Sequence, residues 1–267
     1  MIGVDLSYSR LSLTALENLR RKGAGVIGQC LWTAAEQPAP RIENLRLAVN
    51  EGWPVFGYIS INARQEGDWH VGKGCSGVPD DLWNKLRFIA VDVELPGIQV
   101  TDIIKAVSEV RALGKIAIIY TSSNVWHNYI NPSNSTMAAV NYHVPLWYAN
   151  WNGRAAIDPA EITYGGWDRI TTVGKQYTGG TQVGTWPNAI DVDFNIFDDP
   201  FIHGQEDQMT PEERAALNAL VAKVARDEKL TVVGALYNIR SLCAIAGVAV
   251  PAEVTRKIAY IEAMSNG

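Results

Sequence analysis

The residues with the clearest capacity for chemistry are Asp92 and Glu94, which close the run Arg87-Phe-Ile-Ala-Val-Asp-Val-Glu94. The apolar part of this run predicts a buried strand, and Leu95-Pro96-Gly97 ends it. Side chains two apart on a strand point to the same side, with their Cα atoms roughly 6.5–7 Å apart. Cleavage of a glycosidic bond needs one protonated and one ionised carboxyl group. The pair therefore favours a glycosidase site, although two solvated acids at a strand end would give the same pattern.

Acidic residues also occur on two other expected strands. Asp5 lies in Gly3-Val-Asp-Leu-Ser7, and Asp193 lies in Ile190-Asp-Val-Asp-Phe-Asn-Ile-Phe197. In a closed barrel the first and eighth strands are neighbours, so Asp5 and Asp193 should meet in one cleft. Asp193 is preferred to Asp191 because it lies nearer the carboxyl end of its strand. Acids on three separate strands predict a functional site at one rim of the barrel.

The elements that must position these acids follow an alternating pattern. Segments with helical spacing, such as Leu11–Lys22, Arg41–Glu51 and Thr101–Leu113, separate the first five strands, and Gly23, Gly52 and Gly114 follow them as expected helix ends. This alternation predicts parallel strands with right-handed crossovers. The expected strands are Ile2–Leu6, Gly25–Trp32, Pro54–Ile61, Arg87–Val93, Lys115–Thr121, Val144–Ala149, Ile170–Tyr177 and Ala189–Phe194.

The last three strands follow one another too closely for complete helical crossovers. Gly179-Gly180 and Gly184 predict a hairpin turn between Tyr177 and Ala189. The fold class predicted for residues 1–203 is therefore an α/β, TIM-like (β/α)5(β)3 barrel. In such a barrel the site lies at the carboxyl ends of the strands.

Residues 208–267 differ in character and predict a small helical module. Thr210-Pro211-Glu212-Glu213 has the pattern of a helix start, and two further helices are expected near Val232–Ala246 and Ala252–Met264. A module of this kind would bind a cell wall or join two copies of the chain into a homo-oligomer.

Composition excludes several other classes of function. The chain is 47% apolar and 19% charged, which is sufficient for a full core. Its net charge of −5 and lack of a basic stripe argue against a nucleic-acid partner. No apolar run reaches the length of a membrane span, and no secretory signal peptide begins the sequence.

Neither a metal nor a cofactor is expected. Cys30, Cys75 and Cys243 are odd in number and have no C-x-x-C spacing, so they are expected to be reduced. His70 lies five residues before Cys75, but two candidate ligands in a Gly-rich segment make a poor metal site.

Six segments, in order, resemble glycoside hydrolase family 25, the Chalaropsis-type lysozymes, over most of positions 3–197. Gly3-Val-Asp-Leu-Ser7 is similar to the family's opening G-x-D-x-S, and Phe88–Glu94 is similar to its central D-x-E strand. The later matches are Ile119-Tyr-Thr-Ser122 followed by Trp126, Pro145-Leu-Trp-Tyr-Ala149, Gln176-Tyr177, and Val192-Asp-Phe-Asn195. The family's barrel has five regular crossovers and three final strands, in agreement with the strand pattern above.

The resemblance implies a lysozyme, or N-acetylmuramidase, that cleaves the β-1,4 bond between N-acetylmuramic acid and N-acetylglucosamine in peptidoglycan. By position, Glu94 corresponds to the general acid, and Asp92 would orient or stabilise the reacting centre. A general acid must be protonated near neutral pH, so burial and the charges of Asp92, Asp5 and Asp193 should raise its pKa. The residues placed where sugar contacts would lie are Tyr58, Tyr120, Trp147, Tyr148 and Gln176, and each could instead belong to the core.

The chain departs from the family pattern at the expected sugar-contacting rim. Tyr8-Ser9-Arg10, Tyr58-Ile59-Ser60 and Trp32-Thr33 replace residues that are usual in the family. The simplest role is a phage endolysin that is made in the host cytoplasm and acts on the cell wall after release. Two alternatives are a chitinase-like barrel glycosidase and a catalytically inactive barrel that binds carbohydrate or serves a phage particle structurally.

Overall fold

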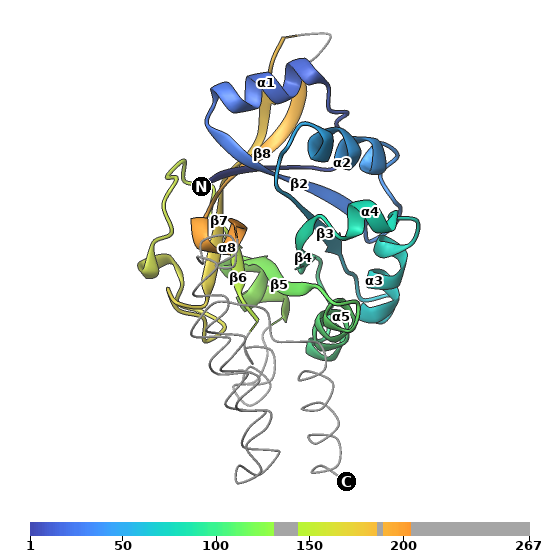
Figure 1. The fold of residues 1–267 in the computed structure, drawn as a ribbon. Coiled ribbons are helices and arrows are strands. Elements are labelled where there is room, and N and C mark those ends of the chain that lie inside the picture. Colours follow the sequence, from blue (N-terminus) through green and yellow to red (C-terminus); the bar gives the residue numbers. More distant parts are fainter. Residues whose placement is uncertain (131–143, 186–188, 204–267) are drawn as a thin grey trace, which may run out of the picture. The chain divides into compact units, whose positions relative to one another are not determined.

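The computed structural model describes residues 1–130, 144–185 and 189–203. The chain divides into two compact units, Met1–Asp198 and Asp199–Gly267, and the first contains a closed barrel whose strands follow sequence order (Figure 1). The strands are β1 (Ile2–Leu6), β2 (Ala24–Thr33), β3 (Val55–Ser60), β4 (Leu86–Asp92), β5 (Ile116–Ser122), β6 (Leu146–Ala149), β7 (Thr172–Val183) and β8 (Ile190–Phe197). In the second unit only the short helix α8 (Asp199–His203) is described, and the predicted helical module at 208–267 lies outside the described residues.

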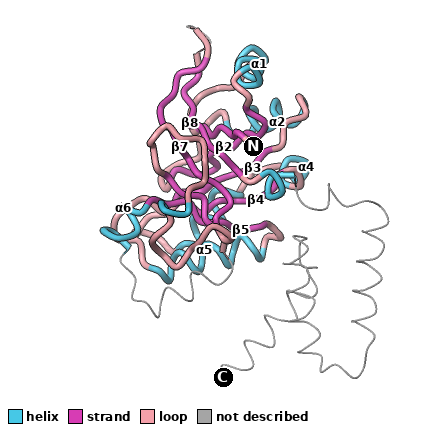
Figure 2. The backbone as a smooth tube through the Cα atoms, turned by 90° about the vertical axis from the view of Figure 1, so that its left-hand side faces the viewer, coloured by secondary structure: helices cyan, strands magenta, loops and turns pink. Residues whose placement is uncertain are grey.

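The barrel is parallel from β1 to β7, and β8 runs antiparallel to both of its neighbours. Helices join the parallel strands and lie outside the barrel (Figures 1 and 2). They are α1 (Leu13–Arg21), α2 (Arg41–Asn50), α3 (Gly67–Cys75), α4 (Asp80–Trp83) and α5 (Val100–Ala112). After β5 come α6 (Ser123–Val125) and the π-helix η1 (Trp126–Ile130), and the 3₁₀-helix η2 (Pro159–Glu161) follows β6. The predicted α/β barrel with an irregular final part is confirmed.

Local sequence signals account for the helical crossovers. The Ser12 hydroxyl caps α1 by accepting a hydrogen bond from the Ala15 N–H at 3.1 Å. Gly23, Gly52 and Gly114 follow α1, α2 and α5 with positive φ angles of 83°, 75° and 78°. Glycine adopts this conformation without the steric cost that a Cβ imposes, so these residues end the helices as predicted.

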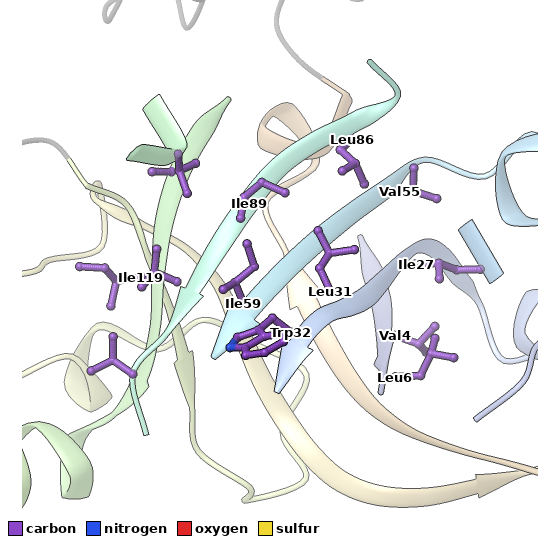
Figure 3. Close-up of a cluster of buried hydrophobic side chains, with 14 of the residues drawn as sticks. Val4, Leu6, Ile27, Leu31, Trp32, Val55, Ile59, Leu86, Ile89 and Ile119 are labelled. Atoms are coloured by element: carbon purple, nitrogen blue, oxygen red, sulfur yellow. The ribbon is translucent and has the colours of Figure 1, made fainter. Parts of the chain in front are cut away.

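The outer face of the barrel wall packs into the main hydrophobic core. In β4, only Arg87 is exposed, because helices cover the outside and side chains fill the inside. Figure 3 shows outward side chains of five neighbouring strands forming one apolar layer. The labelled members are Val4, Leu6, Ile27, Leu31, Trp32, Val55, Ile59, Leu86, Ile89 and Ile119.

The interior of the barrel is filled by four aromatic side chains, here called the aromatic floor: Phe56, Phe88, Trp147 and Phe197. The Phe56 ring stacks on Phe88 at 4.5 Å between centroids and meets Phe197 edge-on at 5.3 Å. Trp147 lies 5.5 Å from Phe56 and 5.5 Å from Phe197. Edge-to-face and offset contacts of this kind favour a fixed arrangement of rings. The floor therefore supports whatever lies nearer the carboxyl ends of the strands.

Gly28 on β2 makes room for the aromatic floor. A Cβ at this position would lie 2.3 Å from Phe56 Cζ and 2.9 Å from Asp5 Cβ. The Phe56 ring cannot withdraw easily because Phe88 and Phe197 pack against it. The absence of a side chain at Gly28 is thus a steric requirement of the barrel interior.

The predicted hairpin between Tyr177 and Ala189 is confirmed, but its first strand ends later than predicted. β7 continues through Gly179-Gly180 to Val183, so the hairpin turn comes later, although β7 and β8 do form the expected antiparallel pair (Figure 2). Gly180 has a positive φ of 61°, and the register with β8 shifts between Thr178 and Thr181. The two glycines therefore form a bulge in the strand, where an extra residue bends and twists the chain. Glycine supports a bulge and a turn equally well, and the sequence pattern does not separate them.

Replacing Gly28 should test the aromatic floor. Gly28→Ala is expected to lower the free energy of unfolding by roughly 1–3 kcal/mol, because overpacking forces rings and backbone out of place. Gly72→Ala is the matched control: Gly72 lies in α3, and nothing lies within 4 Å of an added Cβ. That variant should be neutral or more stable by up to about 1 kcal/mol. Urea unfolding would measure both, and equal stability of the two variants would contradict the steric role of Gly28.

Candidate active site

Asp92 and Glu94 lie at the carboxyl end of β4, as predicted. Asp92 is the last residue of the strand, and its Oδ2 accepts a hydrogen bond from the Ser60 hydroxyl at the end of β3. Its other oxygen, Oδ1, is buried and has no hydrogen-bond partner among the described residues. Glu94 is two residues further on and is exposed at the rim. β4 thus presents one buried and one exposed acid at the same edge of the barrel.

Asp5 and Asp193 meet as predicted, and they pair directly across β1 and β8. Directly opposed residues of an antiparallel pair point to the same face. The reason given for choosing Asp193 is nevertheless wrong, because β8 runs antiparallel and its carboxyl end lies away from this rim. Asp191, nearer the amino end of β8, is exposed. Asp193 belongs to the cluster because of its register with Asp5.

Two buried amides, Gln176 on β7 and Asn195 on β8, hold the carboxyl groups together. Gln176 Nε2 donates to Asp5 Oδ2 at 3.2 Å and to Asp193 Oδ2 at 3.3 Å. Asn195 Nδ2 donates to the same Asp5 oxygen at 2.8 Å. The Gly180 N–H, from the β7 bulge, donates to Asp193 Oδ1 at 2.6 Å. Asp5 and Asp193 therefore share one donor and lie in a single hydrogen-bonded network.

Indole N–H groups set the orientation of both amides. Trp151 Nε1 donates to Gln176 Oε1 at 2.7 Å, and Trp147 Nε1 donates to Asn195 Oδ1 at 2.9 Å. An indole N–H can only donate, so each amide must turn its oxygen toward the tryptophan. Each amide NH₂ then faces the carboxylates. The Tyr120 hydroxyl also donates to Gln176 Oε1, at 2.7 Å.

Burial and mutual repulsion raise the pKa values of the acids on β1 and β4. Burial and the charge of Asp193 raise the pKa of Asp5 to about 7, against hydrogen bonds from Asn195 and Gln176 that oppose the rise. Burial also raises the pKa of Asp92 to about 6, against the hydrogen bond from Ser60 and with a contribution from Asp5. Each charge makes the next ionisation harder, so the protons belong to the network as a whole.

Glu94 has the most strongly raised pKa of the cluster. Desolvation and the charges of Asp92 and Asp193 together raise it to about 8. Burial also raises the pKa of Asp193, against the Gly180 N–H. Glu94 can therefore hold a proton at neutral pH while it remains accessible.

Four of the five residues predicted to contact sugar lie beside the acids. Tyr120 and Gln176 belong to the hydrogen-bonded network, and Trp147 belongs to the aromatic floor below it. The buried Tyr58 hydroxyl lies 2.7 Å from the Ser7 hydroxyl, and the charges of Asp5 and Asp92 help to raise its pKa well above the usual value. These four side chains are buried and support the acids from below.

Tyr148 does not join the acid cluster. Its hydroxyl donates to Glu161 Oε2 at 2.7 Å on the outer side of the barrel wall. Adjacent strand residues point to opposite faces, so Trp147 and Tyr148 cannot both face the interior. Three residues that the sequence analysis did not assign to the site are part of it: Ser60, Asn195 and Trp151. The only sequence signals for them were Asn195 two residues after Asp193, and a tryptophan just after β6.

A metal centre and a membrane span find no support in the described part of the chain. Within residues 1–130, 144–185 and 189–203, no group of three or more His, Cys, Asp or Glu side chains is arranged to hold a metal ion. None of the helices in these ranges is both long and apolar enough to cross a membrane.

Known structures share this barrel. No protein-family model matches the sequence, and no curated protein is similar to it at a significant level. A family 25 glycosyl hydrolase from Bacillus anthracis superposes with a TM-score of 0.55 at 15% identity, over 76% of this chain and 92% of its own. A muramidase from Acremonium alcalophilum gives 0.56 at 16% identity, over 78% of this chain and 100% of its own. The catalytic domain of a Listeria monocytogenes bacteriophage endolysin gives 0.53 at 14%, over 78% and 98%. The chain therefore has the barrel fold seen in family 25 glycosyl hydrolases.

The raised pKa of Asp5 predicts how stability depends on pH. The unfolded carboxyl group loses its proton near pH 4, whereas the folded one keeps it until about pH 7. The folded state binds more protons in this window, so stability should fall as the pH rises through it. Asp5→Asn removes this titration and should raise the free energy of unfolding at pH 8 by roughly 1–3 kcal/mol. Urea unfolding at pH 5 and pH 8 would measure the difference.

The control for this prediction is Asp81→Asn. Asp81 is an exposed acid that pairs with Arg46 at 2.9 Å, and exposed ion pairs contribute little to stability. Its replacement should leave the pH dependence unchanged. If Asp5→Asn shows the same fall in stability between pH 5 and pH 8 as the parent chain, Asp5 does not hold a proton in the folded state.

Proposed function

We propose that this chain is a peptidoglycan hydrolase, an N-acetylmuramidase that cleaves the β-1,4 bond between N-acetylmuramic acid and N-acetylglucosamine. One observation carries the proposal: Glu94 is accessible at the rim, and desolvation together with the charges of Asp92 and Asp193 raises its pKa to about 8. A glycosidase needs such an acid, because the leaving oxygen must receive a proton at neutral pH. The similar structures include a muramidase and an endolysin, which supports the choice of substrate.

Glu94 is the proposed general acid. It lies at the carboxyl rim, where the sites of such barrels are built, and a glycan strand can approach it from solvent. The charges of Asp92 and Asp193 favour the protonated form of Glu94, and they repel the Glu94 carboxylate that forms when the proton passes to the glycosidic oxygen. Hydrogen bonds to Asp193 from Gln176 and from the Gly180 N–H reduce that repulsion.

Asp92 is the proposed assisting carboxylate. The Ser60 hydroxyl binds one of its oxygens and opposes the rise in its pKa, which favours an ionised group near neutral pH. The other oxygen is buried without a partner among the described residues. A buried acceptor without a hydrogen-bond partner costs free energy unless a ligand supplies the partner. A donor of the bound sugar, or the positive charge that develops in the transition state, would complete it.

Asp5 and Asp193 are proposed to act on the two β4 acids through their charge. Asp5 is almost fully buried, and Gln176 and Asn195 both donate to its Oδ2, so it is already satisfied by the protein. It contributes to the raised pKa of Asp92, and Asp193 contributes to that of Glu94. In biological terms the proposed role is that of a phage endolysin acting on the glycan strands of the bacterial cell wall.

Glu94→Gln should abolish most of the activity while the fold remains intact. General-acid catalysis contributes roughly 100- to 10,000-fold, so release of reducing ends from purified peptidoglycan should fall by about that factor. Glu17→Gln is a matched control, since Glu17 is an exposed acid of α1 paired with Arg21. Wall lysis by Glu94→Gln at the rate of the parent chain would show that Glu94 is not the acid.

The reaction products decide between the proposed function and its alternatives. Mass spectrometry should find muramic acid at the new reducing ends of digested peptidoglycan. Release of chitin fragments in place of these products would identify a chitinase-like enzyme. Binding to walls without any new reducing ends would identify an inactive carbohydrate-binding barrel.

Ser60→Ala should move the acid limb of the pH profile. The Ser60 hydrogen bond lowers the pKa of Asp92, so its loss should shift the limb near pH 6 to higher pH by roughly half to one unit. The alkaline limb, set by Glu94 near pH 8, should stay in place. The profile of kcat/KM reports these apparent values. Ser108→Ala on α5 is the control, and a shift of both limbs together in Ser60→Ala would contradict the role of Ser60.

A further inference from the structure

A polar cavity lies at the ends of β5 and β6, which are neighbours in the barrel wall (Figure 1). Its volume is about 260 Å³, and the mechanism proposed above uses none of its lining side chains. The lining residues that carry the inference are Ser123, Asn124, Tyr148, Asn150, Glu161 and Tyr164. They offer hydroxyl groups, amides and one carboxylate, so the cavity suits a ligand rich in hydrogen-bonding groups.

The single charge in this lining is already neutralised. Lys175 is fully buried behind the cavity, and its Nζ lies 2.8 Å from Glu161 Oε2. The same carboxylate accepts hydrogen bonds from the Tyr148 hydroxyl and from Asn152 Nδ2, both at 2.7 Å. Glu161 therefore has little capacity left to attract a cation. A ligand of this cavity should be uncharged.

Tyr164 carries a polar group that no described residue satisfies. It lines the cavity, only 4% of its surface is exposed, and its hydroxyl oxygen is buried without a hydrogen-bond partner among the described residues. The rings of Trp167 and His127 contact Tyr164 at 5.9 Å and 6.0 Å between centroids and hold it in place. Buried hydroxyl groups are almost always paired, so this one indicates a ligand that supplies the partner.

The cavity is joined to the acid cluster by two consecutive residues. The Asn150 N–H donates to the Gln176 carbonyl oxygen at 3.0 Å, and the Trp151 indole donates to Gln176 Oε1. Trp151 is 66% exposed, so it presents a flat aromatic surface beside Gln176 and next in sequence to Asn150 of the cavity. Flat apolar faces of sugar rings stack on such surfaces. A polymer bound at the acids can therefore continue over Trp151 toward the cavity.

We propose that this cavity is a further subsite for the glycan strand, and that it takes one neutral N-acetylated amino-sugar unit beside those that flank the cleaved bond. The inference rests on the proposed function for the identity of the polymer. The volume is below the roughly 300–1,000 Å³ of drug-sized pockets, so it suits one sugar unit better than two. The neutral lining disfavours wall peptides, whose carboxylate and amine groups are charged.

Direct binding tests the subsite without turnover. The full-length chain carrying Glu94→Gln would be titrated by calorimetry with a peptide-free disaccharide and a peptide-free tetrasaccharide of alternating N-acetylglucosamine and N-acetylmuramic acid. Adding Tyr164→Phe should weaken the affinity for the tetrasaccharide by roughly three- to tenfold, which is the effect of one lost hydrogen bond. The affinity for the disaccharide should not change. Tyr129→Phe, at an exposed tyrosine of η1 outside the cavity, should change neither.

A melting curve separates binding from folding. The Tyr164 hydroxyl has no described partner, so Tyr164→Phe should not lower the Tm, and a lower Tm would assign the hydroxyl a structural partner and overturn the subsite. Unchanged tetrasaccharide affinity, or equal weakening of both sugars, would also overturn it. The subsite would also be overturned if Tyr164→Phe lowered the affinity only for a tetrasaccharide that carries stem peptides.

These outcomes are distinguishable from failure of the proposed function. If the parent chain releases reducing ends from walls but Tyr164→Phe leaves sugar affinity intact, only the subsite is wrong. If the parent chain releases none, yet Glu94→Gln binds the tetrasaccharide in a Tyr164-dependent way, the subsite stands and the muramidase activity is wrong. If neither sugar binds, the subsite is overturned outright.

Discussion

Repulsion between carboxyl groups gathered at one rim is the constraint on which the site depends. Asp5, Asp92, Glu94 and Asp193 come from three strands, and no described lysine or arginine forms an ion pair with any of them. Like charges at close range favour the protonated form of a carboxyl group, which a general acid requires. The same repulsion lowers the stability of the fold at pH values above the pKa of the free groups. The barrel closure that brings β1 beside β8 makes this repulsion unavoidable.

Neutral donors limit that repulsion without abolishing it. Gln176, Asn195, Ser60 and the Gly180 N–H each bind one or two of the carboxyl groups. A lysine in their place would favour the ionised acids and lower the pKa of Glu94. Amides and hydroxyl groups also donate hydrogen bonds to the carboxyl oxygens, but they carry no charge and lower the pKa less than a lysine would. A proton can therefore remain in the network. The orientation of the two amides in turn depends on tryptophan indoles, and one of these, Trp147, belongs to the aromatic floor.

Local patterns and barrel closure made much of the fold predictable. The apolar run of β4, the helix-ending glycines and the alternation of strands and helices depend on short segments, and all were confirmed. The meeting of Asp5 and Asp193 followed from closure alone. The bulge at Gly180 was not predicted, because it depends on how β7 and β8 pair. Ser60, Asn195 and Trp151 were missed for the same reason, since their roles exist only through partners far along the chain.

Successive side chains of β6 and β7 point alternately into and out of the barrel, so the two faces of this part of the wall differ in chemistry. On β7, Gln176 points to the acids, while its neighbour Lys175 is buried on the outer side and pairs with Glu161. On β6, Trp147 and Tyr148 divide in the same way. The outer pairing keeps the charge of Lys175 away from the carboxyl cluster, whose raised pKa values a nearby cation would lower. The same alternation that prevents Tyr148 from reaching the acids therefore places its hydroxyl against Glu161, and it leaves the outer face neutral and polar.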